Sequence, residues 1–261
     1  MNRLKQLQEF NIYESESGFF YENDFRHELL KERIYDVINT YKPEIVVKAG
    51  IGSGSLILDL ISDHKEIVLV VVEPSLKVIE KFINENSSNP EIKGIRFING
   101  EFTQFPIDYY AADFIICVDN LDILESAPVI DEFRRALEFD GYLLFGGVVL
   151  HDEDLDGVYD DYMRLIFPLH NDYYLKDDLK TFLNLKDFSF IKGNMEFFDF
   201  NLADLTEHLK GLYDVPVNKA DEFIESNIEA FRKLYTLEEK IIKLPYFTGL
   251  FLRRKIRIDV P

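Results

Sequence analysis

The stretch from Ile45 to Gly54, with the sequence IVVKAGIGSG, constrains the fold of this chain most strongly. A run of apolar, mostly β-branched residues leads directly into Gly50, Gly52 and Gly54, and then into a segment compatible with a helix. This order is typical of a buried strand that ends at a tight turn before a helix. Glycine accepts a positive φ and lets a ligand approach the backbone, and the following helix points unpaired N–H groups at the same place. The stretch therefore predicts a ligand-binding turn.

The composition is that of an acidic globular protein. Of the 261 residues, 47% are hydrophobic, and 29 basic against 48 acidic residues give a net charge of −19. This field repels phosphate backbones and anionic lipids, so we expect no nucleic acid and no membrane as partner. A neutral or cationic small molecule suits the field better, although we favour the alternative that the acidity serves only solubility. The single cysteine, Cys117, cannot form an internal disulfide, which favours a reducing compartment. The sequence has no apolar run of membrane-spanning length, and its N-terminus lacks the apolar core of a signal peptide. We therefore expect a cytoplasmic protein.

Strand and helix patterns alternate along the chain. Apolar residues at helical spacing predict a helix from Asp24 to Tyr41, and the apolar run from Ile67 to Glu73 predicts a central strand that ends in an acid. Further strands are expected at residues 94–100, 115–121, 142–149, 188–198 and 246–258. This alternation favours right-handed crossovers and a mainly parallel sheet.

The ends of the chain are expected to be less regular. Residues 1–22 show no helix or strand pattern that persists, and their cluster Phe19, Phe20 and Tyr21 makes the segment either a lid over a ligand site or a packed loop. We therefore expect an N-terminal segment and helix at residues 1–42 and one domain at residues 43–261. Within that domain, residues of about 200–243 are predicted to form a helical insertion before the last strand.

The spacing of the glycines points to a known family. The dinucleotide-binding fingerprint is GxGxxG, whereas here the glycines fall as GxGxG and Ser55 occupies the third glycine position. With the preceding strand, they resemble motif I of the class I S-adenosylmethionine-dependent methyltransferases of the small-molecule type. Four further features follow in the family's order. They are an acid at the end of strand two, an acid after strand three, a polar end of strand four and an Asp-Gly turn before strand five. The resemblance covers about residues 43–150.

The resemblance implies a Rossmann-like α/β fold, with a mostly parallel seven-stranded sheet, an antiparallel last strand and helices on both faces. It also implies S-adenosylmethionine as cofactor and S-adenosylhomocysteine as product, bound at the carboxyl ends of the strands. Glu73 would accept hydrogen bonds from the ribose hydroxyls, Glu101 and Phe102 would contact the adenine, and Asp119 would emerge beside the methyl group. The expected cofactor contacts are Gly50, Ile51, Gly52, Gly54, Glu73, Pro74, Glu101, Phe102, Asp119 and Asn120.

Few catalytic side chains are expected, because methyl transfer from a sulfonium depends mainly on alignment of the nucleophile, the methyl group and the leaving sulfur. A base is useful if the acceptor is an alcohol or a protonated amine, and His151 and Asp119 are the candidates. An exposed loop histidine is the alternative interpretation of His151. No metal site is expected, because the DxDxDG run from Asp152 to Gly157 has Met163 where a calcium loop requires a glutamate.

One residue departs from the family pattern. Lys48 stands two residues before Gly50, where the family usually carries an acid, and a cation there would repel a sulfonium or ammonium, or recruit a carboxylate. A non-catalytic module that binds S-adenosylmethionine or S-adenosylhomocysteine, or a scaffold, therefore stays open as the alternative. A nicotinamide-dependent oxidoreductase is disfavoured by the glycine spacing, and the oligomeric state is left open.

Overall fold

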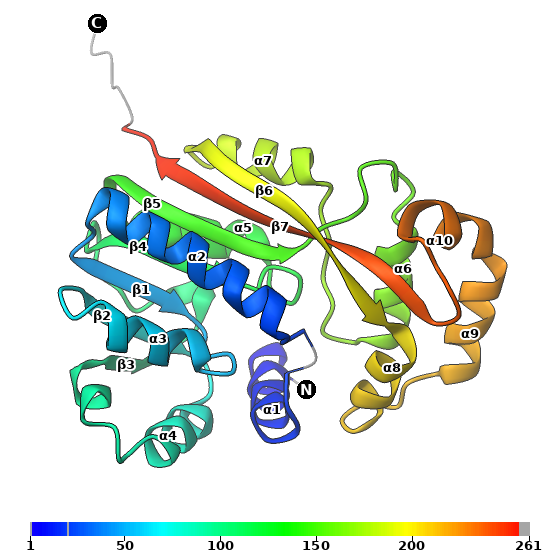
Figure 1. Ribbon diagram of the computed structural model, residues 1–261, viewed down its shortest axis with the longest axis horizontal. Helices are drawn as coiled ribbons and strands as arrows, with labels where there is room; N and C mark the ends of the chain where they lie inside the picture. Colours follow the sequence, from blue (N-terminus) through cyan, green and yellow to red (C-terminus); the bar gives the residue numbers. More distant parts are fainter. Residues whose placement is uncertain (1, 20, 256–261) are drawn as a thin grey trace, which may run out of the picture.

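The computed structural model describes residues 2–19 and 21–255, and its centre is one sheet (Figure 1). The strands are β1 (Ile45–Ala49), β2 (Val68–Glu73), β3 (Arg96–Asn99), β4 (Ala112–Val118), β5 (Leu137–Val148), β6 (Phe188–Asn201) and β7 (Ile241–Arg253). They lie in the order β3-β2-β1-β4-β5-β7-β6. The pairs from β3 to β5 are parallel, whereas β7 is antiparallel to both β5 and β6. This confirms the mostly parallel seven-stranded sheet with an antiparallel last strand.

Helices pack against both faces of this sheet (Figure 1). They are α1 (Arg3–Ser17), α2 (Asp24–Tyr41), α3 (Ser55–Asp63), α4 (Leu76–Glu85), α5 (Ser126–Ala136), α6 (Val158–Ile166), α7 (Lys176–Leu185), α8 (Leu202–Lys210), α9 (Val217–Ser226) and α10 (Ile228–Tyr235), with 3₁₀ turns at Pro90–Gly94 and Phe102–Gln104. The apolar stripe of α2 is buried, and Ile34 and Ile38 have no exposed surface. None of the described helices is both long and apolar enough to cross a bilayer.

The carboxyl ends of the central strands meet at one edge of the sheet. The apolar residues Leu69 to Val72 of β2 are buried, as expected for a strand covered on both faces, and Glu73 follows them at the edge. Because β1 lies between β2 and β4, the residues that follow these three strands emerge side by side. The turn after Ala49, the acid Glu73 and the polar pair after Val118 are thereby placed around one hollow.

The N-terminal segment is a helix, so the expectation of no regular structure in residues 1–22 was wrong for residues 3–17. Helix α1 presents only a narrow apolar stripe, in which Leu7 and Phe10 are buried, and local sequence therefore gave little indication of it. It is held by contacts from distant parts of the chain. The Arg3 guanidinium donates to the carbonyls of Ile123 (2.9 Å) and Leu169 (3.1 Å). Packing of this kind, more than intrinsic propensity, stabilises a helix in a protein.

The last third of the chain extends the sheet beyond the other strands. Long antiparallel pairing from Phe188 with Arg253 to Asn201 with Ile241 joins β6 to β7, and α8, α9 and α10 lie between these strands in the sequence. In Figure 1 the far ends of β6 and β7 reach α8 and α10. Strand β7 begins at Ile241, earlier than the expected residue 246, and the predicted residues 256–258 lie outside the described part of the chain.

The Asp-Gly turn expected before strand five lies inside β5. Asp140 has a φ of +66°, and the pairing with β4 changes register between Ala112 and Phe114, which face Leu137 and Tyr142. The extra residues form a bulge, because a strand that carries more residues than its partner must loop out locally. The structure therefore keeps the bend that the sequence indicated, without interrupting the strand.

Candidate functional site

The turn after β1 has the left-handed backbone that its glycines predicted. Gly50, Gly52 and Gly54 have φ values of +80°, +60° and +83°. A Cβ on Gly54 would stand 2.2 Å from the ring of Phe82, so this glycine is also required by packing against α4. A Cβ on Gly52 would meet only the Lys48 amine, at 3.8 Å, so the backbone there faces open space. The turn thus exposes bare backbone where a ligand can approach it.

Lys48 lies beneath this turn and forms hydrogen bonds with its backbone. Its Nζ donates to the carbonyls of Gly50 (2.6 Å) and Ile51 (3.2 Å), and the residue is 4% exposed. Burial lowers the pKa of Lys48 to about 8, against the opposing effect of the nearby carboxylates Glu73 and Asp119. Its ammonium therefore holds the loop from below.

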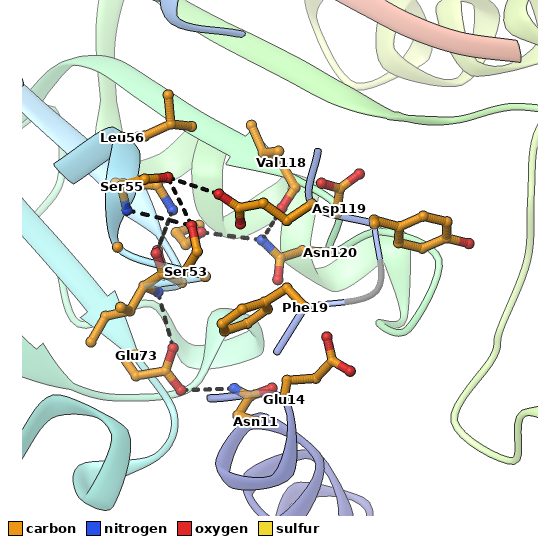
Figure 2. A pocket seen from close by; sticks show the side chains of 18 of the residues that line it. Asn11, Glu14, Phe19, Ser53, Ser55, Leu56, Glu73, Val118, Asp119 and Asn120 are labelled. Carbon is orange, nitrogen blue, oxygen red and sulfur yellow. Dashed lines mark hydrogen bonds between the residues drawn. The ribbon is translucent and has the colours of Figure 1, made fainter. Parts of the chain in front are cut away.

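Glu73 points into the hollow between the turn and α1, as Figure 2 shows. Its Oε2 accepts from the Ile51 N–H (3.1 Å), and its Oε1 accepts from the Ser75 N–H (2.9 Å) and from the Asn11 side-chain amide (2.7 Å). Burial raises the pKa of Glu73, while these three hydrogen bonds favour the ionised form. A carboxylate is thus held at the end of β2, and α1 supplies one of its partners.

Asp119 and Asn120 lie on the opposite side of the hollow (Figure 2). The Asn120 amide donates to the carbonyls of Ala49 (3.1 Å) and Val118 (2.8 Å), and so ties the ends of β1 and β4 together. Asp119 has a φ of +50°, and its Oδ2 accepts from the Arg26 guanidinium at 2.6 Å. Burial raises the pKa of Asp119, and the charge of Arg26 opposes that rise.

One cavity joins these groups. Its empty volume is about 990 Å³, open solvent at its mouth included. The residues expected at a cofactor that line it are Gly50, Ile51, Gly52, Gly54, Glu73, Asp119 and Asn120. Residues of α1, α2 and the segment between them complete the wall, and Phe19 lies in the view between Asn120 and Asn11 (Figure 2).

Three expected cofactor contacts do not line this cavity. Phe102 is buried next to the turn, where its ring would lie 3.9 Å from a Cβ on Gly50. Pro74 offers its carbonyl to the side chains of Gln8 and Asn99, both at 2.9 Å, and Glu101 directly precedes the 3₁₀ turn that begins at Phe102. These residues are therefore not among those that line the hollow.

His151, a candidate base, also lies outside the lining of this cavity. Its backbone N–H donates to the Tyr235 hydroxyl at 3.3 Å, and its Nδ1 accepts from the Glu153 N–H at 3.2 Å. The imidazole therefore belongs to the loop after β5 and its packing on α10. The structure does not bring His151 together with Asp119.

The acidic run that follows His151 caps a helix. The Asp154 carboxylate accepts from the N–H groups of Val158 (2.8 Å) and Tyr159 (3.2 Å) at the start of α6, and from the Tyr235 hydroxyl (2.5 Å). Within residues 2–19 and 21–255, no group of three or more potential metal ligands is found. Asp154 is thus used to hold the backbone of α6.

The sequence gave no signal for a set of polar residues around α2. Ser55, the first residue of α3, donates its hydroxyl to Glu22 (2.9 Å) and lies 3.0 Å from Nδ1 of His27. The other ring nitrogen of His27 lies 2.8 Å from the Asp59 carboxylate. Glu22 and His27 carry no recognisable motif, because their place in the site is set by how α2 docks and not by spacing in the chain.

Asp122 was also missed, although it stands only two residues after Asn120. It lines the main cavity and a smaller neighbouring one between β4, β5 and α7. Burial raises the pKa of Asp122 to about 6, partly offset by the nearby His170. The polar run DNLD at the end of strand four was the signal that could have indicated it.

Comparisons with known proteins agree with this geometry. Residues 47–145 match the family described as Methyltransferase domain. The sequence has no significant match among curated proteins.

Solved structures resemble the fold over most of its length. A Bacillus halodurans protein described as a candidate methyltransferase has a TM-score of 0.74 at 14% identity, covering 86% of this chain and 99% of that chain. The [4+2]-cyclase SpnF has a TM-score of 0.60 at 15% identity, covering 97% of this chain and 94% of that chain. Geranyl diphosphate methyltransferase, solved with S-adenosylmethionine, has a TM-score of 0.57 at 12% identity, covering 87% of this chain and 86% of that chain. Such low identities show the fold alone. Residues 47–145 therefore resemble a methyltransferase domain, and the chain has the Rossmann-like seven-stranded fold of the solved methyltransferase structures that it matches.

Proposed function

We propose that this protein transfers a methyl group from S-adenosylmethionine to a small-molecule acceptor and releases S-adenosylhomocysteine. The observation that carries the proposal is the shared cavity in which the open backbone of Gly52 and the carboxylate of Glu73 face each other. A nucleoside with an amino-acid tail fits that pair, because a carboxylate accepts hydrogen bonds from both ribose hydroxyls while bare backbone accommodates the tail. Geranyl diphosphate methyltransferase, which shares the fold, was solved with this cofactor.

In this arrangement the ribose takes the place that the Asn11 amide now occupies on Glu73. The amino-acid end lies along the turn from Gly50 to Gly52. Pro74 follows Glu73, and the Gly100 N–H donates to the Glu73 carbonyl at 3.2 Å, so we place the adenine toward the ends of β2 and β3. The sulfonium then lies toward Asp119 and Asn120, which form the opposite wall.

The charges of the cavity suit such a cofactor and a neutral or cationic acceptor. The carboxylates of Glu14, Glu22, Glu73, Asp119 and Asp122 line it, and Lys48 donates to the carbonyls of the turn. Transfer forms a bond from the acceptor's nucleophile to the methyl carbon, breaks the carbon–sulfur bond and leaves the electron pair on sulfur. Alignment of these atoms supplies most of the acceleration.

An acceptor that is a protonated amine or an alcohol must also lose a proton. Asp119 is committed to Arg26, and His151 lies outside the cavity lining. Asp122 lies at the same wall, and a carboxyl with a pKa of about 6 is well matched to accept a proton near neutral pH. We therefore assign proton removal to Asp122, with Asp119 as the group that fixes Arg26 beside it.

Lys48, which had kept a non-catalytic module open, gives that alternative no support. Its Nζ donates to two carbonyls of the turn, so we assign Lys48 to support of the loop.

Calorimetry with S-adenosylmethionine, S-adenosylhomocysteine and NAD tests the proposal, followed by mass spectrometry of methyl transfer to a panel of amines and alcohols. We expect binding of the first two and no binding of NAD. Gly52→Val should abolish this binding, because a β-branched side chain is strained at a φ of +60° and fills the open face of the turn.

Gly94→Val is the matched control, since Gly94 is exposed and a Cβ there meets nothing within 4 Å. It should bind like the wild type. Binding of NAD alone would contradict the proposal, and unchanged affinity in Gly52→Val would show that the cofactor lies elsewhere.

A further inference from the structure

The amino-acid end of S-adenosylmethionine carries an ammonium that needs a partner in the cavity. Of the other carboxylates that line the cavity, Glu14 pairs with His208, Asp122 is assigned to the acceptor, and Glu73 and Asp119 have partners within the protein. Glu73 receives three hydrogen bonds from Ile51, Ser75 and Asn11, and Asp119 is paired with Arg26. The end of β1 offers no acid, because Lys48 stands there and donates to the carbonyls of the turn. The ammonium therefore needs a carboxylate from another element.

Glu22 is the carboxylate that the fold brings to the turn. It lies between α1 and α2, where its backbone N–H donates to the Phe19 carbonyl at 3.0 Å. The Ser55 hydroxyl donates to its Oε1 at 2.9 Å, and Ser55 directly follows Gly54. Glu22 lines the main cavity and is only partly buried. One oxygen is thus fixed by Ser55, and the carboxylate lies at the end of the turn.

The electrostatics of the cavity agree with this placement. Burial lowers the pKa of Lys48, and Glu22 is one of the carboxylates that act against that change. Burial also works against the charge of Arg26, yet Asp119, Tyr246 and Glu22 together raise its pKa. Glu22 therefore adds to the negative charge that acts on Lys48 and Arg26, both of which line the cavity.

We propose that Glu22 binds the ammonium of the cofactor's amino-acid end, in place of an acid at the end of β1. This inference rests on the proposed function, since it names a partner for one group of the proposed cofactor. Glu22 is joined to α1, which reaches Glu73 through Asn11, and to α2, which reaches Asp119 through Arg26. A ligand that carries the ammonium therefore also holds the N-terminal segment on the cavity.

A comparison of two ligands tests the proposal. S-adenosylhomocysteine carries the ammonium, whereas 5′-methylthioadenosine keeps the nucleoside and lacks the amino-acid end. Glu22→Gln keeps the shape of the side chain and an oxygen for Ser55, but it removes the charge. We expect the Kd for S-adenosylhomocysteine to rise about ten- to a hundredfold, as for loss of one hydrogen bond to a charged group. The Kd for 5′-methylthioadenosine should change less than about twofold, because its contacts are untouched.

Glu28→Gln is the matched control, since it removes the same charge from an exposed position on α2 and should leave both affinities unchanged. Equal weakening of both ligands by Glu22→Gln would overturn the proposal, as would an unchanged Kd for S-adenosylhomocysteine. If the wild type binds neither ligand, the proposed function fails as well. If the wild type binds both and Glu22→Gln does not discriminate between them, only the role of Glu22 fails.

Discussion

At the scale of single residues, several polar side chains of the site already have hydrogen-bond or charged partners within the protein. Lys48 and Asn120 hold the backbone of β1 and β4, and Arg26 neutralises Asp119. Asp122 differs, because the hydrogen bonds that stabilise its carboxylate come from backbone N–H groups of Asp122 and Ile123. Asp122 also lines the cavity, so we propose it as the group that exchanges a proton with an acceptor.

The role of Asp122 predicts a pH dependence of methyl transfer. Its carboxylate must be ionised to take a proton, and its pKa is raised to about 6, so kcat should fall as the pH drops below about 6. The titratable groups that interact with it are His170, Asp119, the Cys117 thiol and the hydroxyls of Tyr21, Tyr173 and Tyr246. Asp122→Asn should lower kcat by about 10²- to 10⁴-fold and remove this acidic limb.

The measurement is kcat against pH from 5 to 9, with an acceptor identified from the panel. Asp108→Asn, at an exposed position in the loop before β4, is the control and should keep the wild-type profile. An acidic limb that persists in Asp122→Asn would assign the proton transfer to another group.

At the scale of elements, α1 joins the site to segments that are far from it in the sequence. It reaches Glu73 through Asn11, and on its other side Glu14 pairs with His208 of α8 while the Tyr13 hydroxyl donates to the His208 carbonyl at 2.6 Å. The helical insertion between β6 and β7 thus supports the helix that forms part of the cavity wall next to Glu73. Figure 1 shows α1 at the carboxyl end of β1.

This arrangement predicts that weakening the docking of α1 weakens cofactor binding. Phe10 is 7% exposed, and its ring centroid lies 5.0 Å from that of Phe167. Phe10→Ala should cost on the order of 3 kcal/mol in packing, speed hydrogen exchange of the α1 amides and raise the Kd for S-adenosylhomocysteine.

Phe25→Ala, at a residue of α2 that is 51% exposed, is the control and should alter neither quantity. Unchanged exchange in Phe10→Ala would mean that α1 is held by its polar contacts alone.

The same scale separates what sequence could predict from what it could not. The hollow between Gly52, Glu73 and Asp119 followed from local patterns, because parallel strands put their carboxyl ends at one edge and each strand end is marked by its own residues. Helix α1 left only a faint pattern, since distant partners such as Ile123 and Leu169 stabilise it. Glu22 could not be identified for the same reason, because the docking of α2 and the hydroxyl of Ser55 place it.

At the scale of the whole molecule, the net charge of −19 and the acidic cavity both favour a neutral or cationic ligand. Carboxylates surround the place proposed for a sulfonium, and the buried cations Lys48 and Arg26 are each matched by acceptors within the protein. The long ribbon of β6 and β7, with α8 behind it, lies outside the matched residues 47–145 yet supports α1 at the site. Cofactor binding is therefore expected to depend on the full chain.

The central claim is that Glu73 and the turn at Gly52 hold one nucleoside with an amino-acid tail. A crystal structure of the full chain with S-adenosylhomocysteine tests it most directly. We expect the ribose hydroxyls within hydrogen-bond distance of the Glu73 carboxylate, the Asn11 amide displaced from it, and the amino-acid tail along Gly50 to Gly52. A ligand bound elsewhere, or a Glu73 carboxylate that keeps its contact with Asn11 and none with the ribose, would contradict the account.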